Sequence, residues 1–67
     1  MKEDKEWIAR IIESSTNDFH IEACHILINL FCCKYGAPFE AVEGWEDAAT
    51  ELKIALDSKD IALEMAQ

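Results

Sequence analysis

One pair of residues in the sequence has the spacing of a metal-binding motif. Glu22 and His25 are three positions apart, and residues three apart on a helix lie on the same face. Di-iron carboxylate bundles use two such Glu-x-x-His pairs with two further glutamates. This chain has one pair, so a symmetric dimer would have to supply the second, and Asp18 could join the same face. A dimeric metal-binding bundle is therefore one alternative function, and a solvated polar stripe is the simpler interpretation.

Two other groupings of His and Cys carry weaker signals. His20 and Cys24 are four apart and could share a zinc ion, but zinc sites need four ligands, usually from separate segments. Cys32 and Cys33 lack the C-x-x-C spacing of redox-active thiols, and the C-terminal end of a helix disfavours a thiolate. An odd number of cysteines is not a disulfide framework. We interpret all three as reduced core residues of a cytoplasmic protein.

The common catalytic and nucleotide-binding motifs are missing from the sequence. It has no G-x-S-x-G, P-loop or G-x-G-x-x-G pattern and no recognisable Ser-His-Asp set. The segment Asp57-Ser58-Lys59-Asp60 resembles the Asp-Ser-Leu of acyl carrier proteins, but the resemblance covers four residues and lysine replaces the leucine. Too little chain follows it to complete a carrier bundle, so we interpret Asp57 and Ser58 as helix caps. We expect no enzymatic activity and no cofactor.

The net charge of −8 is concentrated in the second half of the chain. Residues 1–36 carry six acids and four bases, whereas residues 37–67 carry eight acids and two bases. Without a Lys/Arg cluster, such a surface repels the phosphate backbone of nucleic acids. We therefore expect no direct binding to nucleic acid and none to a membrane. A protein partner with a basic surface is expected instead.

The spacing of apolar residues is helical throughout the chain. It predicts a first helix over residues 3–14, with an apolar stripe formed by Trp7, Ile8, Ile11 and Ile12. A second helix is predicted over residues 18–35. One of residues 15–17 would cap its start, and Gly36 would end it. This second helix is apolar over most of its circumference, which indicates a buried helix.

A third helix is predicted to begin near Pro38, a residue that suits the first helical position. Gly44 lies inside this pattern and costs about 1 kcal/mol there relative to alanine, so it could instead mark a break. Residues 59–66 could add a short C-terminal fourth helix. The prediction is thus an all-α protein, with residues 1–67 as a single helical domain: a small bundle of three long helices plus this short fourth one.

The strongest surface feature is a set of carboxylates predicted to share one face of the third helix. They are Glu40, Glu43, Glu46, Asp47 and Glu51. This face could serve solubility alone, or it could bind a basic partner. We interpret the chain as a non-enzymatic protein–protein interaction module, of the kind found in small acidic regulators or inhibitors and in phage or mobile-element accessory proteins.

Residues 34–42 loosely resemble the middle of a helix-turn-helix unit, with a helix, a Gly-containing turn and a second helix. The positions after the turn are acidic where a DNA reader would carry Arg, Lys, Asn or Gln. A degenerate helix-turn-helix-like regulator that does not bind DNA is therefore the other alternative function.

The other helices of the chain cannot bury all of the apolar surface of the second helix, which predicts a homodimer. The residues expected at the dimer interface are Ile21, Ile28, Phe31, Cys32 and Tyr35. Trp7, Phe31 and Leu52 are each central to the apolar stripe of their helix, so we expect them to meet in one buried cluster.

The charge distribution generates a first testable prediction. In a gel-shift titration near physiological salt, the protein should show no binding to duplex DNA, because its surface repels phosphates. Micromolar binding that weakens steeply with added salt would contradict this interpretation of the charge.

Overall fold

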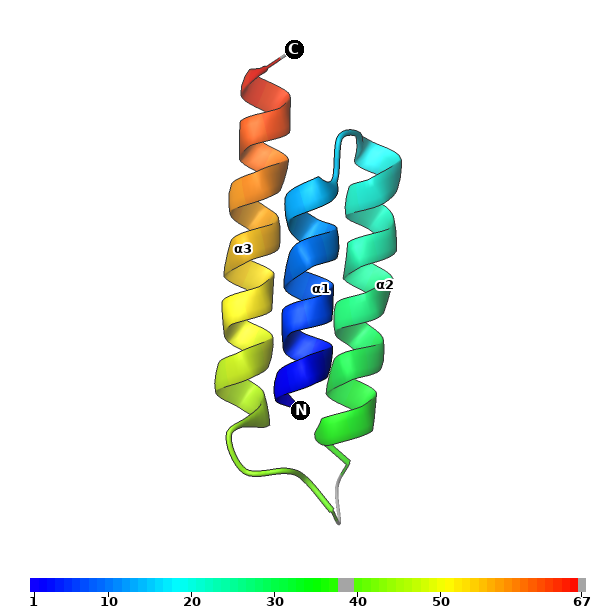
Figure 1. Ribbon diagram of the computed structural model, residues 1–67, viewed down its shortest axis with the longest axis vertical. Coiled ribbons are helices and arrows are strands. Elements are labelled where there is room, and N and C mark those ends of the chain that lie inside the picture. The colour runs from blue at the N-terminus through cyan, green and yellow to red at the C-terminus, as the bar shows by residue number, and fades with distance from the viewer. Residues whose placement is uncertain (38–39, 67) are drawn as a thin grey trace.

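The computed structural model describes residues 1–37 and 40–66, which form three helices. These are α1 (Lys2–Ser14), α2 (Asp18–Tyr35) and α3 (Trp45–Met65). They lie side by side along one long axis, with α2 antiparallel to the other two (Figure 1), and the bundle measures 44 × 16 × 16 Å. No strand occurs in the described part of the chain. The predicted all-helical bundle of three long helices is confirmed.

The turn between α1 and α2 is closed by short polar side chains. Asn17 caps α2, because its side-chain oxygen accepts a hydrogen bond from the backbone N–H of His20 at 3.0 Å. Ser15 is buried, and its hydroxyl donates to the carbonyl oxygen of Ile11 at 3.0 Å and lies 3.5 Å from the sulfur of Cys24. The turn therefore buries a polar group without leaving it unsatisfied.

α2 ends at Gly36 as predicted, but glycine is required at this position mainly because of close packing. A Cβ atom there would lie 2.7 Å from the carbonyl oxygen of Cys32 and 2.8 Å from the ring of Trp45. Only glycine lets the first side chain of α3 pack this closely against the end of α2. Gly44 has a positive φ of 85° and is the N-cap of α3.

The predicted start of the third helix is wrong. Pro38 itself lies outside the described residues, but α3 begins at Trp45, and residues 40–44 form turns before it. The left-handed backbone of Gly44 sets this start, since a helix cannot continue through it.

The short fourth helix is not observed, because α3 continues without interruption to Met65. No glycine or proline occurs within α3 to break it. Lys59 also ties this part of α3 to α1, since its ammonium group donates to the carbonyl oxygen of Glu13 at 2.8 Å. Asp57 and Ser58, which the sequence suggested as caps, are exposed residues inside the helix. None of the described helices is long and apolar enough to cross a membrane.

The core lies along the shared axis of the three helices. Its buried residues are Ile8 and Ile12 on α1, Ile21, Cys24, Ile28 and Phe31 on α2, and Ala48, Ala49, Leu52 and Leu56 on α3. Phe31 and Leu52 are buried as predicted, but the prediction for Trp7 is wrong, because 55% of its surface is exposed. At about 100° per residue, Trp7 lies at the edge of an apolar arc centred on Ile8 and Ile12.

Polar contacts near the start of α1 join it to both neighbouring helices at the surface. Asp4 accepts hydrogen bonds from Lys34 at 2.8 Å and from the hydroxyl of Tyr35, both on α2. The hydrogen bond from Lys34, reinforced by that from Tyr35, lowers the pKa of Asp4 below its ordinary value of 3.8. The same contact raises the pKa of Lys34. Lys5 forms an ion pair with Glu51 on α3.

The burial pattern generates a stability prediction. Replacing Phe31 or Leu52 by alanine should reduce the free energy of unfolding by about 2–5 kcal/mol, because each substitution leaves a cavity in the core. Trp7→Ala should cost less than either, since its side chain closes no cavity. Urea denaturation followed by circular dichroism measures all three. A Trp7→Ala variant as unstable as Phe31→Ala would contradict the exposed position of Trp7.

The contacts of Asp4 predict a pH dependence of stability. A lowered pKa in the folded state stabilises the protein at pH values above 3.8, and this contribution is lost as the pH falls through the folded-state pKa. Asp4→Asn should therefore be less stable than the wild type at neutral pH, with a difference that shrinks in acid. Thermal unfolding between neutral pH and pH values below 3.8 measures this, with Glu6→Gln on the same helix as a control. A difference that stays constant with pH would contradict the assigned cause.

Candidate functional site

The five acidic residues singled out in the sequence do not share a helix face. Glu40 and Glu43 lie in the connection before α3, and Glu46 and Asp47 lie in its first turn. Glu51 is about one turn further along and is paired with Lys5 of α1. The structure thus separates Glu51 from the other four, which gather at one end of the bundle because Gly44 delays the start of α3.

A hollow opens among these residues at the start of α3, and we call it the acidic hollow. Its volume is about 360 Å³, and it is lined by Ala41, Val42, Glu43, Gly44, Trp45, Glu46 and Asp47. Val42 is 41% exposed, and Trp45 is partly buried with its ring against Gly36. Apolar surface and three carboxylates therefore meet within one turn of the chain.

None of the carboxylates of the acidic hollow forms an ion pair with another described residue. Residues 37–52 contain no lysine or arginine. The two lysines that α1 and α2 contribute to polar contacts are engaged elsewhere, Lys34 with Asp4 and Lys5 with Glu51. The acidic hollow can therefore accept a long basic side chain, with its methylene stem on the apolar surface and its charged end among the carboxylates.

The predicted dimer-interface residues on α2 face inward instead. Ile21, Ile28 and Phe31 are buried in the core, while Cys32 and Tyr35 are partly buried and pack against it. The ring centroids of Phe31 and Tyr35 are 4.8 Å apart. These five side chains are covered by α1 and α3, so they do not form a free surface.

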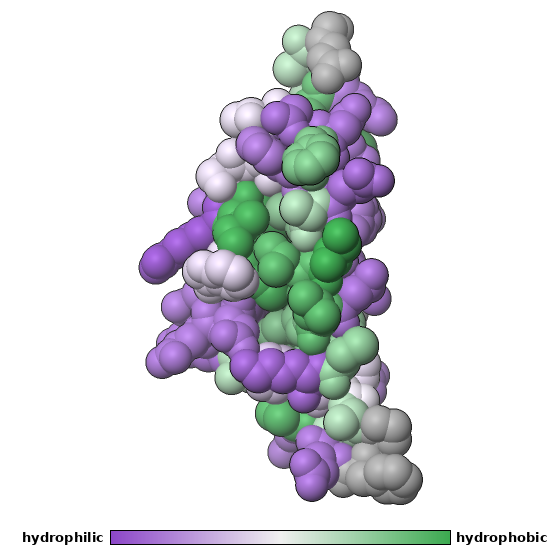
Figure 2. Space-filling view, turned by 90° about the vertical axis from the view of Figure 1, so that its right-hand side faces the viewer, coloured by the Kyte–Doolittle hydropathy of each residue, from purple (hydrophilic) through white to green (hydrophobic). Residues whose placement is uncertain are grey.

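The opposite side of α2 is apolar and exposed, whereas the exposed apolar surface was predicted on the side of Ile21, Ile28 and Phe31. We call this surface the outer stripe; it consists of Phe19, Ala23, Ile26, Leu30 and Cys33. Figure 2 views the bundle from the α2 side and shows a hydrophobic patch along the middle of this face, with hydrophilic side chains on both flanks. The expectation that all three cysteines belong to the core is also wrong, because Cys33 is exposed.

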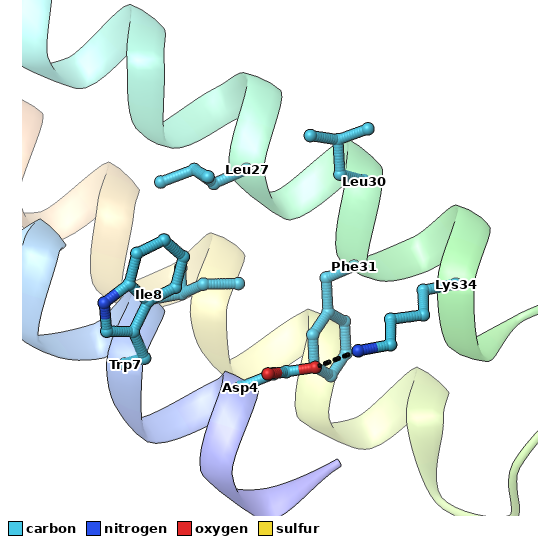
Figure 3. Close-up of a pocket in the computed structure, with 7 residues that line it drawn as sticks. All are labelled: Asp4, Trp7, Ile8, Leu27, Leu30, Phe31 and Lys34. Carbon is cyan, nitrogen blue, oxygen red and sulfur yellow. Dashed lines mark hydrogen bonds and ion pairs between the residues drawn. The ribbon is translucent and has the colours of Figure 1, made fainter.

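A groove between α1 and α2 borders the outer stripe. Trp7 of α1 and Leu27 of α2 lie on its two sides, and Ile8 and Phe31 form its floor. Figure 3 shows the indole of Trp7 turned toward Leu27 across the groove, with the Asp4–Lys34 ion pair at one end. The groove has a volume of about 230 Å³ and widens the apolar surface from α2 onto α1.

The candidate metal ligands share a groove with other carboxylates but do not form a metal site with them. Glu22 and His25 lie in this shallow groove between α2 and α3, which Asp18, Asp60 and Glu64 also line. No group of three His, Cys, Asp or Glu side chains among the described residues is placed to hold a metal ion. Cys24 is fully buried beside Ser15, whereas His20 is exposed, so they do not form a zinc-binding pair.

The helix-turn-helix arrangement that residues 34–42 suggested is not observed. In that motif the two helices cross at about 90–120°. Here α2 and α3 lie side by side and antiparallel along the length of the bundle (Figure 1). The two helices therefore act as parts of one core, and neither projects as a recognition helix would.

Comparisons of the chain with protein-family models, with curated proteins and with solved structures give no match.

Proposed function

We propose that the chain is a non-catalytic protein-binding module whose acidic hollow binds a basic segment of another protein. The observation that carries this proposal is the combination, in one hollow, of apolar surface from Val42 and Trp45 with the carboxylates of Glu43, Glu46 and Asp47. A lysine or arginine side chain has the matching combination of an apolar stem and a cationic end.

The charge of the surroundings supports a basic partner. Residues 40–47, at this end of the bundle, carry four acids and no lysine or arginine, so their field attracts cations and repels anions. Such a field increases the rate of encounter with a positively charged partner and disfavours nucleic acids and acidic proteins. The acidic hollow then provides specificity at short range.

Glu46 and Asp47 also have a structural role, which the test must separate from binding. Both lie in the first turn of α3, where negative charge stabilises a helix by about 0.3–1 kcal/mol per residue. Replacing them by lysine would therefore weaken the helix as well as the proposed site. Neutral amides keep the shape of the side chains and one acceptor oxygen on each, and they place no positive charge at the start of the helix.

The test titrates isotope-labelled protein with a synthetic hexa-arginine peptide and follows the backbone amide shifts by NMR. We expect the largest shifts at residues 41–47. The variant Glu43→Gln/Glu46→Gln/Asp47→Asn should bind at least about tenfold more weakly, because three charge-assisted contacts are lost. Circular dichroism checks that its helix content is unchanged.

A matched control removes three charges from the other end of the same helix. The variant Asp57→Asn/Asp60→Asn/Glu64→Gln has the same net charge as the test variant but retains the acidic hollow. It should bind the peptide nearly as well as the wild type. Equal weakening in the two variants would show that the peptide senses only net charge, and this would overturn the proposed site.

A further inference from the structure

The outer stripe of α2 is a second surface that the proposed function does not use. Its large side chains are well exposed, with exposed fractions of 78% for Phe19, 60% for Ile26 and 58% for Leu30. Trp7, across the adjacent groove, is 55% exposed. A helix surface with an apolar residue in every turn normally packs against another helix.

We infer that the outer stripe is the interface of a homodimer, in which α2 packs against α2 of a second copy of this chain. Three features of the molecule identify the second copy as the occupant: the distribution of charge, the geometry of the stripe and the area that it offers.

The charge distribution leaves this side of the molecule open to another copy. Two chains of charge −8 repel each other, most strongly through the connection and α3, where six of the eight net charges lie. The outer stripe contains no charged residue, and α2 as a whole carries only Asp18 and Glu22 against Lys34. Contact through α2 therefore keeps the acidic parts of the two chains apart. A basic partner, in contrast, gains nothing from a neutral apolar surface.

The stripe is complementary to itself. Ile26 is one of the two central residues of α2, which spans Asp18–Tyr35. A two-fold axis beside Ile26 and Leu27 therefore pairs the two α2 helices antiparallel over their whole length, with Ala23 of one chain facing Leu30 of the other. Antiparallel helices also have opposed macrodipoles. The two copies of Glu22 would be about 13 Å apart along the helix axes, beyond the Debye length of about 10 Å at 0.1 M salt.

The available area is of the size that a weak but specific dimer needs. An 18-residue helix is about 27 Å long and 10–12 Å across, so its outward half covers on the order of 500 Å². Trp7 and Leu27 extend this surface toward the standard interface of about 800 Å² per partner. We therefore expect a dimer that forms at micromolar concentrations, rather than one that never dissociates.

Sedimentation equilibrium at tens to hundreds of micromolar protein tests the inference. The wild type should approach twice the chain mass of 7.6 kDa as its concentration rises. Ile26→Glu should weaken association at least about tenfold, since it places a charge at the centre of the apolar contact. The matched control is Ile54→Glu on the outward side of α3, because Ile54 is also 60% exposed. It should associate like the wild type.

A second matched pair guards against a folding defect in one variant. Leu30→Glu should behave like Ile26→Glu, whereas Ile61→Glu on α3, with 57% exposure against 58% for Leu30, should not. Circular dichroism confirms the helix content of each variant.

A wild type that remains near 7.6 kDa at every concentration would overturn the inference, whatever else binds the stripe. Equal effects of the α2 and α3 variants would do the same. The result is independent of the proposed function, because the variant Glu43→Gln/Glu46→Gln/Asp47→Asn, which lacks the charges of the acidic hollow, should dimerise at least as well as the wild type.

Discussion

The packing of α2 against both α1 and α3 is the interaction on which the rest of the structure depends. Cys24, Ile28 and Phe31 place one side of α2 in the centre of the core, where Leu52 and Leu56 of α3 meet them. Two neighbouring helices can cover only one side of a third. Because α2 is apolar on two opposite sides, the packing that forms the core also leaves the outer stripe in water. Both the stability of the chain and the exposed outer stripe therefore follow from one helix.

The helices were predictable from the sequence where local signals agree. Asn17 caps the start of α2 and Gly36 lies at its end, as expected, and apolar spacing identifies all three helices. In the second half of the chain, neighbouring residues favour different positions for the start of the third helix. Pro38 suggests a helix start, but the positive φ of Gly44 delays α3 to Trp45. Asp57 and Ser58 have cap-forming side chains that are also tolerated on a helix surface. Contacts further along favour a continuous α3, because Lys59 donates to the carbonyl oxygen of Glu13 on α1 and Leu63 packs against the core.

The exposed surfaces were harder to predict, because they depend on which way each helix faces. The apolar residues of α2 do not distinguish Ile28, which is buried, from Ile26, which is 60% exposed. Only the positions of α1 and α3 decide between them. The sequence shows which residues are acidic, but their arrangement follows from the start of α3 at Trp45 and from the ion pair of Glu51 with Lys5. The ion pair joins residues far apart in the sequence, and the start at Trp45 depends on the left-handed conformation of Gly44, which the sequence left open.

The two proposed surfaces are compatible, because they lie on different sides of the molecule. The acidic hollow lies at the start of α3, at one end of the bundle, while the outer stripe runs along the outward side of α2 from Phe19 to Cys33. An antiparallel pairing of two α2 helices places the C-terminal end of each beside the N-terminal end of the other. The two acidic hollows would then lie at opposite ends of the dimer, where their like charges are far apart. A partner with two basic segments that can span this distance would be held by both hollows, and its apparent affinity would exceed that of either hollow alone. The same charge that opposes association of the chains through α3 would thus direct the partner to the two ends of the dimer.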